Sequence, residues 1–258
     1  MKNKTAKQIV NNYRCACAGV ILLNVIGIIA GILLLSVQPL IGIAVIVVLL
    51  ATSKSTIKSL REKMIERVLY EDLDAEKFSE IEKLGAFGKS KHHKLLAAMY
   101  SGDHDTVLSL TEQEMKNEIN PVKLCNSLYK RGYVYFERED TDSLKEVVRE
   151  FYKLKKQHAK YGAIFENYSV FEKYDAFLDG DYQFVVDICE YDLKNDSKKS
   201  QNHKLTILNV SYYRAVALYK LEQYDEARDA FQRIIEYAPK TYKAKLSQDY
   251  LSKIEANS

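Results

Sequence analysis

The chain has 258 residues, 28% of them charged, and a formal net charge of +3. Its basic excess lies in residues 2–14 and 54–70, so the remainder is net negative and offers no basic face for nucleic acid. Four cysteines without regular spacing predict no disulfide framework. Ten glycines and three prolines leave little material for tight hairpins, so we expect an all-α protein.

Residues 15–53 contain no charged side chain and form an apolar run that is interrupted only near residues 36–39. A membrane-spanning helix needs roughly 20 apolar residues, so the run predicts two spans, 15–35 and a shorter one at 38–53. Pro39 suits the first turn of the second helix. Because only helices satisfy their own backbone groups in lipid, we expect a transmembrane helical hairpin. A cleaved signal peptide is the alternative, but its apolar region is usually 7–15 residues long.

Basic residues flank this hairpin on both sides. The N-terminus, residues 1–14, has four lysines and arginines and no acid, and residues 54–70 have five against two acids. Positive flanks stay on the cytoplasmic side, so we expect a two-span protein of the cell membrane with both termini in the cytoplasm. Asn24 lies inside the first span, where it either bonds a partner helix in a homo-oligomer or is simply tolerated.

Residues 54–88 are predicted to form amphipathic connecting helices. Apolar residues recur at helical spacing between lysines and glutamates, so the segment either leads from the membrane into the soluble domain or lies on its surface. They are Ile57, Leu60, Met64, Ile65 and Val68.

The C-terminal part contains one clear repeat, between Ser211 and Pro239. Small residues allow two helices to approach closely, aromatic residues fill the gaps, and a proline follows the second helix. The residues that carry this pattern are Ala215, Leu218, Tyr224, Ala227, Phe231, Ile234 and Pro239. The segment resembles a tetratricopeptide repeat (TPR), a helix-turn-helix unit of about 34 residues.

Three weaker copies precede this unit, with turns at residues 102–107, 139–144 and 180–185. Equivalent positions, separated by 37, 41 and 42 residues, are Val107, Leu144, Val185 and Ala227. These spacings predict extended helices or loops. We therefore expect residues 89–258 to form a TPR-like α-solenoid of about four units, with a capping helix near residues 242–254.

Aligning the units reveals a second repeat on one face of their first helices. The repeated positions lie 0, 3, 7 and 10 residues after an asparagine in each unit, and these offsets fall on one helix face. Val170 and Val216 occupy two of these positions. The resemblance implies that this face lines a concave groove, where an asparagine ladder can bond a peptide backbone. The candidate partner-binding residues are Asn126, Tyr129, Tyr133, Phe136, Asn167, Tyr174, Phe177, Asn209, Tyr212 and Tyr219. The alternative is that the aromatics are core residues and the asparagines cap helices.

No pattern in the sequence predicts an enzyme, a metal site or a cofactor. Residues 85–90 have the wrong glycine spacing for a phosphate loop, and the adjacent His92 and His93 point apart on a helix. We therefore expect a membrane-anchored TPR-like scaffold or adaptor that binds a protein or peptide partner at the cytoplasmic surface of the bilayer. The alternative is a structural or regulatory subunit of a membrane complex assembled through the hairpin.

Overall fold

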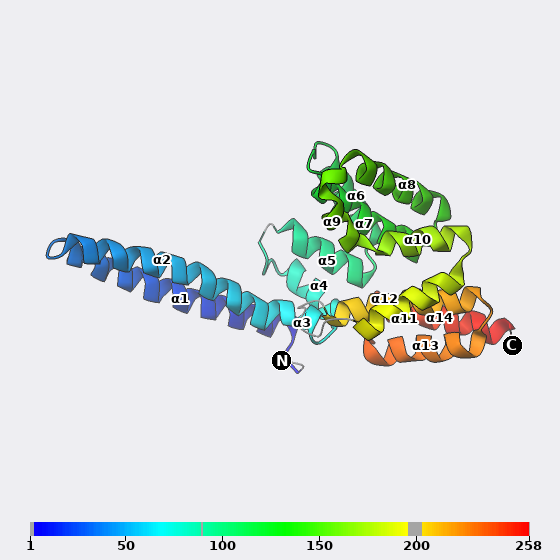
Figure 1. Cartoon of the computed structure of the whole chain (residues 1–258). Helices are drawn as coiled ribbons and strands as arrows, with labels where there is room; N and C mark the ends of the chain where they lie inside the picture. The colour runs from blue at the N-terminus through cyan, green and yellow to red at the C-terminus, as the bar shows by residue number, and fades with distance from the viewer. Residues whose placement is uncertain (1–2, 89, 196–202, 258) are drawn as a thin grey trace. The chain divides into compact units, whose positions relative to one another are not determined.

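The computed structural model describes residues 3–88, 90–195 and 203–257, and these residues form helices and no strand (Figure 1). The all-α prediction is therefore confirmed. The chain divides into two compact units, Met1–Gly88 and Lys89–Ser258.

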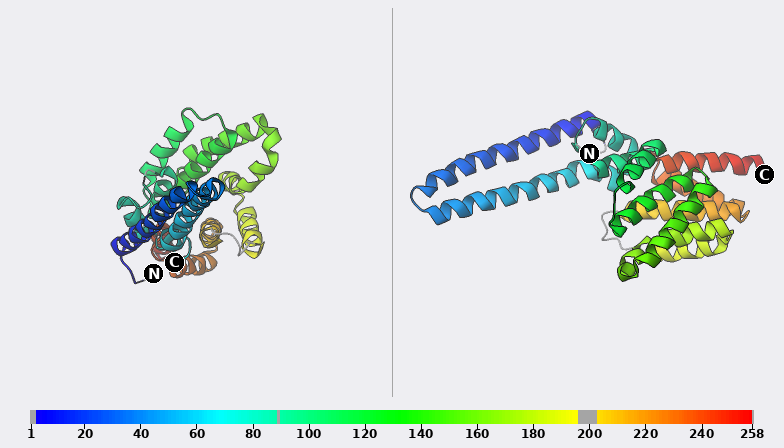
Figure 2. Two further views of the ribbon diagram at one scale, coloured as in Figure 1. Left: turned by 90° about the vertical axis from the view of Figure 1, so that its left-hand side faces the viewer. Right: turned by 90° about the horizontal axis from the view of Figure 1, so that it is seen from above.

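The first unit is built on a long helical hairpin of α1 (Ala6–Leu35) and α2 (Pro39–Arg61), which lie side by side (Figures 1 and 2). Helix α1 begins well before the predicted start at residue 15. Thr5 accepts a hydrogen bond from the backbone N–H of Gln8, and the Gln8 side chain accepts one from Thr5, so a capping box fixes this start. Pro39 occupies the first turn of α2, as predicted.

Small residues lie between the two helices of the hairpin, and large apolar residues lie outside. A Cβ atom on Gly42 would lie 2.7 Å from the Gly31 carbonyl oxygen, so the helices approach closely at this level. Exposed large apolar side chains include Ile21, Leu22, Leu23, Ile29, Leu33, Leu40, Val47 and Val48. Both helices are long and apolar enough to cross a membrane.

The base of the hairpin forms a small core. Helix α2 continues through a π-helical turn, Glu62–Glu66, into α3 (Arg67–Tyr70), and α4 (Ala75–Lys83) follows. The first turns of α1 pack against the π-helical turn and α4. The buried residues here include Ala6, Ile9, Val10, Ile65, Leu69, Phe78 and Ile81. The basic N-terminus is therefore largely helical and packed.

The second unit consists of four helix-turn-helix units and a closing helix. The pairs are α5 (Lys91–Ser101) with α6 (His104–Met115), α7 (Pro121–Glu137) with α8 (Thr141–Gln157), α10 (Val170–Asp179) with α11 (Tyr182–Asn195), and α12 (His203–Lys220) with α13 (Tyr224–Tyr237). Helix α14 (Tyr242–Asn257) follows. The connection from α8 to α10 contains the short helices Ala159–Tyr161, α9 (Gly162–Phe165) and Glu166–Tyr168, which account for one of the long repeat spacings.

The four turns share one backbone conformation. Each has a residue of positive φ, followed by a residue whose N–H donates to the carbonyl five positions earlier. The positive-φ residues are Gly102, Glu139, Gly180 and Glu222. The positions predicted to be equivalent, Val107, Leu144, Val185 and Ala227, are all buried. The predicted repeats are therefore confirmed.

Helix α14 contacts both ends of the repeat array. It packs on α13, and it also touches α5 of the first pair. The Tyr242 ring meets the His104 ring edge-on at 5.0 Å between centroids, and it leaves no room for a Cβ atom on Gly102. The closing helix thus reaches across the array to its first unit.

Candidate functional site

The candidate groove residues fall into different places within the second unit. The asparagines and Tyr129 line one hollow, and three tyrosines lie in the core. Phe136 and Phe177 line a smaller hollow, and Tyr219 packs against the closing helix. The helix face that the sequence predicts therefore consists of an open polar part, a buried part and an aromatic part.

The middle of this face is core. Tyr133, Tyr174 and Tyr212 are all buried, and the Tyr174 hydroxyl lies 3.0 Å from the hydroxyl of Tyr213. Phe136 stacks on Tyr174 with 5.6 Å between ring centroids. The expectation that these tyrosines line an open groove does not describe the structure, because neighbouring helices cover them.

Lys243 of the closing helix occupies part of this covered region. Its ammonium lies 2.7 Å from Glu137 Oε1, and 4.3 and 4.4 Å from the ring centroids of Tyr133 and Tyr212. The other Glu137 oxygen is 2.8 Å from His104 Nε2. Burial lowers the pKa of Lys243 below its ordinary value, while the Glu137 carboxylate opposes that shift. Aromatic faces and a carboxylate together stabilise a buried cation.

Sequence reasoning missed Lys243, Glu137 and His104. The available signal is that Lys243 precedes Ser247, Tyr250 and Ile254 by 4, 7 and 11 residues, all on one helix face. That face is buried. A lysine at a core position of an amphipathic helix requires a buried partner, but nothing in the local sequence identifies Glu137 as that partner.

The three asparagines of the predicted ladder line a single hollow. Asn126 belongs to α7, Asn167 to the short helix before α10, and Asn209 to α12. The hollow has a volume of about 310 Å³. Its other lining residues are Tyr129, Tyr168, Ser169, Val170, Lys173, Asp192, Thr206, Val210 and Tyr213. We call this the asparagine hollow.

The chemistry of the asparagine hollow is polar and almost uncharged. Asn126 and Asn167 are exposed, whereas Asn209 is buried and donates from Nδ2 to the Tyr100 hydroxyl at 3.1 Å. The Oδ1 atom of Asn209 has no hydrogen-bond partner among the residues that the structure describes. Lys173 is buried and its ammonium lies 2.8 Å from Asp192 Oδ2, so the one cation and the one anion of the lining neutralise each other.

Tyr129 and Tyr168 lie side by side in the lining of the asparagine hollow. The Tyr129 ring lies 6.4 Å from that of Tyr168 between centroids, and burial raises the pKa of Tyr129 to about 12. Its hydroxyl is therefore uncharged at neutral pH.

The opposite end of the predicted face is aromatic. Phe136 and Phe177 are in edge contact at 4.8 Å between centroids and line a hollow of about 240 Å³. Tyr219 packs on Tyr250 of α14 and on Tyr224 of α13 instead, with centroids 5.0 and 5.8 Å apart. These residues support the closing helix and the adjacent turn.

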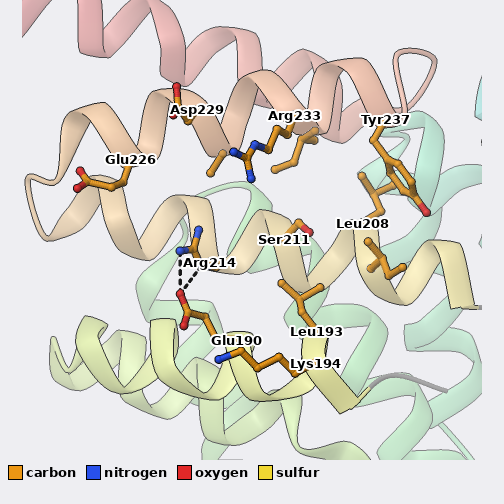
Figure 3. Close-up of a pocket in the computed structure, with 13 residues that line it drawn as sticks. Glu190, Leu193, Lys194, Leu208, Ser211, Arg214, Glu226, Asp229, Arg233 and Tyr237 are labelled. Atoms are coloured by element: carbon orange, nitrogen blue, oxygen red, sulfur yellow. Dashed lines mark hydrogen bonds and ion pairs between the residues drawn. The ribbon is translucent and has the colours of Figure 1, made fainter. Parts of the chain in front are cut away.

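A larger hollow of about 580 Å³ lies between α11, α12 and α13, and no sequence pattern predicts it (Figure 3). Arg214 donates to Glu190 Oε1 from both Nε and Nη2, at 3.2 and 2.8 Å. Leu193 and Leu208 contribute apolar surface below the exposed Arg233. Among the described residues, this hollow contains no buried side-chain polar atom without a hydrogen bond.

Residues 209–241 match the family model of the tetratricopeptide repeat. This match confirms the resemblance predicted for residues 211–239, and it begins at Asn209. No curated protein and no solved structure matches the chain. The chain thus contains a tetratricopeptide repeat within a helical-repeat unit, preceded by two long apolar helices.

Proposed function

We propose that this protein is a membrane-anchored scaffold or adaptor that binds a protein partner through the asparagine hollow, at the cytoplasmic surface of the cell membrane. TPR repeats generally act as scaffolds for protein–protein interaction, and the chain contains one. The fold alone identifies no partner, so the proposal depends on the chemistry of the hollow.

One observation carries the partner-binding part of the proposal. Asn126 of α7, Asn167 of the short helix before α10 and Asn209 of α12 line one hollow. Asn126 and Asn167 are exposed, so a partner can reach their side-chain amides, each of which offers both a donor and an acceptor.

The hairpin supports the membrane part of the proposal. Its large apolar side chains lie outside, and Gly27, Gly31 and Gly42 lie between the helices, which suits lipid on the outer surface. In water such a surface would be an aggregation site. Basic residues at both ends favour termini on the cytoplasmic side, with the turn at residues 36–38 on the other side.

The alternative, a subunit assembled through hairpin oligomers, has less support. Asn24 Nδ2 donates to the Val20 carbonyl of its own helix at 2.7 Å, so this donor is already satisfied. Gly31 and Gly42 face each other within the hairpin and are used in its own packing. The two glycines and the Asn24 Nδ2 atom are therefore engaged within one chain, whereas Asn24 Oδ1 has no hydrogen-bond partner among the described residues.

Affinity purification from membranes tests the proposal with two charge-matched variants. Asn126→Lys with Asn167→Lys places two cations in the exposed part of the asparagine hollow, whereas Gln183→Lys with Gln232→Lys places two on exposed positions outside it. We expect the first variant to lose a partner that the wild type and the second variant retain. Retention of every co-purifying protein by the first variant would contradict the proposal.

A further inference from the structure

The larger hollow of Figure 3 lies on a different face of α12 from the asparagine hollow. Residues three or four apart share one face of a helix. Asn209 and Tyr213 of α12 line the asparagine hollow, whereas Ser211 and Arg214 line the larger one. We call the larger one the α11–α13 hollow, because these two helices both pack on α12 and form its walls. The two hollows are therefore separate surfaces of the second unit.

The α11–α13 hollow has accessible apolar surface. Leu193 and Ile207 are half-buried, whereas Leu208 and Ile234 are buried. The volume is about 580 Å³, nearly twice the 310 Å³ of the asparagine hollow, and ligand pockets typically measure about 300–1,000 Å³. Covering the half-buried leucine and isoleucine with other apolar groups removes their surface from water, which is favourable. The hollow therefore suits apolar side chains of a partner.

Two cations of the α11–α13 hollow have no anion within the protein. Arg214 is already paired, because its Nε and Nη2 atoms both donate to Glu190 Oε1. Arg233 of α13 and Lys194 of α11 are exposed, and neither forms an ion pair with a residue that the structure describes. Each wall of the hollow thus offers a cation with which an incoming anion can pair.

The acidic residues that α13 contributes to the lining point away from Arg233. Glu226 and Asp229 precede Arg233 by about two turns and one turn of the helix, and Figure 3 shows their carboxylates directed away from its guanidinium. A guanidinium presents its N–H donors in one plane and can hold a carboxylate through two of them. The hollow thus combines apolar surface with a guanidinium that is open to a carboxylate.

We propose that the α11–α13 hollow is a second docking surface, which binds a segment of a partner polypeptide in which a glutamate or aspartate is flanked by leucine-like residues. The carboxylate pairs with Arg233, Lys194 adds attraction from the opposite wall, and the apolar side chains pack on Leu193 and Ile207. Charge complementarity selects an acidic segment, and the apolar surface selects its neighbours. This surface gives the chain a binding site that is independent of the asparagine hollow.

Three small probes test the charge preference. The peptide acetyl-Leu-Glu-Leu-amide carries the acidic side chain, acetyl-Leu-Gln-Leu-amide is its uncharged match, and acetyl-Leu-Lys-Leu-amide reverses the charge. Saturation-transfer difference spectra are recorded with the full-length protein in nanodiscs of zwitterionic lipid, and affinities come from titration. We expect the glutamate peptide to bind about twofold to fivefold more tightly than the glutamine peptide, the effect of one exposed ion pair. The lysine peptide should bind most weakly.

Three variants separate the charge from the apolar contact. Arg233→Glu should make the lysine peptide bind more tightly than the glutamate peptide. Lys145→Glu makes the same change of sign at an exposed residue of α8, outside the hollow, and should leave the order of the three probes unchanged. Leu193→Ser should weaken the glutamate and glutamine peptides alike and keep the ratio of their affinities, because it removes apolar contact and no charge.

Two results would overturn the inference outright. They are equal binding of the glutamate and glutamine peptides to the wild type, and an unchanged order of the probes in Arg233→Glu. Tighter binding of hexanoate than of the glutamate peptide would also overturn it, because the hollow would then suit a small anionic amphiphile better than a polypeptide segment.

The probes require no partner at the asparagine hollow, so the two proposals fail separately. Loss of a partner in the Asn126→Lys, Asn167→Lys variant, together with equal binding of the glutamate and glutamine peptides, would contradict this inference alone. The expected order of the probes, together with retention of every co-purifying protein in that variant, would contradict the assignment of the partner to the asparagine hollow alone.

Discussion

The ion pair between Lys243 and Glu137 makes the sharpest prediction about the closing helix. Lys243→Met keeps the length and most of the packing of the side chain but removes the ammonium. The Glu137 side chain is fully buried and is hydrogen-bonded to Lys243 and His104. The substitution removes the first partner, so His104 alone of these two is left to compensate the buried carboxylate. Removing one partner of a buried ion pair typically costs about 3–5 kcal/mol. We expect a decrease of this size in the free energy of unfolding of the second unit.

A second ion pair of the closing helix supplies the control. Lys253 of α14 and Glu139 beside α7 are 2.9 Å apart, but their side chains are 47% and 48% exposed. Because solvent screens exposed pairs, Lys253→Met should cost about 0–1 kcal/mol. Denaturant unfolding of the full-length protein in detergent, followed by circular dichroism, measures both variants.

A double variant separates the ion pair from the packing. Replacing both partners, as Lys243→Met with Glu137→Leu, removes the uncompensated carboxylate and should recover much of the stability lost in Lys243→Met. If Lys243→Met costs no more than Lys253→Met, the assignment of a buried, closing ion pair is refuted.

Three other changes test separate parts of the structure. Gly180→Ala places a methyl group at a residue of positive φ with open space around it, and it should lower the free energy of unfolding by about 1–2 kcal/mol. Gly102→Ala has the same backbone strain, and its methyl group also collides with the Tyr242 ring. It should therefore cost more in the same denaturation assay. Burial raises the pKa of each of four tyrosines well above 10. The stability that depends on their neutral form is therefore complete below about pH 10 and is lost as the pH rises further. Tyrosinate absorbance should appear together with unfolding. These residues are Tyr133, Tyr174, Tyr212 and Tyr213. Burial raises the pKa of the Cys125 and Cys189 thiols to about 12, so maleimide should label them only after denaturation.

Short-range patterns made the repeats readable from the sequence. In each turn a residue of positive φ precedes the first residue of the next helix, and a buried residue follows it five positions later. This fixed distance aligns the four units with one another. The clear unit at 211–239 could be recognised from residues that contact one another within a single helix pair. The asparagine repeat at positions 126, 167 and 209 could likewise be read by alignment, and the three residues do line one hollow, but Asn167 lies in the short helix before α10 and not in the first helix of a pair.

Contacts between distant parts of the chain decided which candidate residues are open. Tyr133 and Tyr212 recur at the spacing expected of one helix face, and that spacing is the same for an exposed face and a buried one. Only the packing of α14 over them shows that they are covered. Lys243 and Glu137 are 106 positions apart in the sequence, so local periodicity cannot pair them. The early start of α1 has a similar cause, because Ile9 and Val10 are buried against elements that follow the hairpin.

Site-specific photo-crosslinking in cell membranes tests the central claim most directly. A photoreactive phenylalanine analogue replaces Asn126, Asn167 or, as a control, Gln232, all of which are exposed. The account predicts that the analogue at 126 and at 167 crosslinks to the same protein, and that at 232 it does not. Absence of an adduct at both hollow positions, or equal crosslinking to that protein from position 232, would contradict the claim that the asparagine hollow binds the partner.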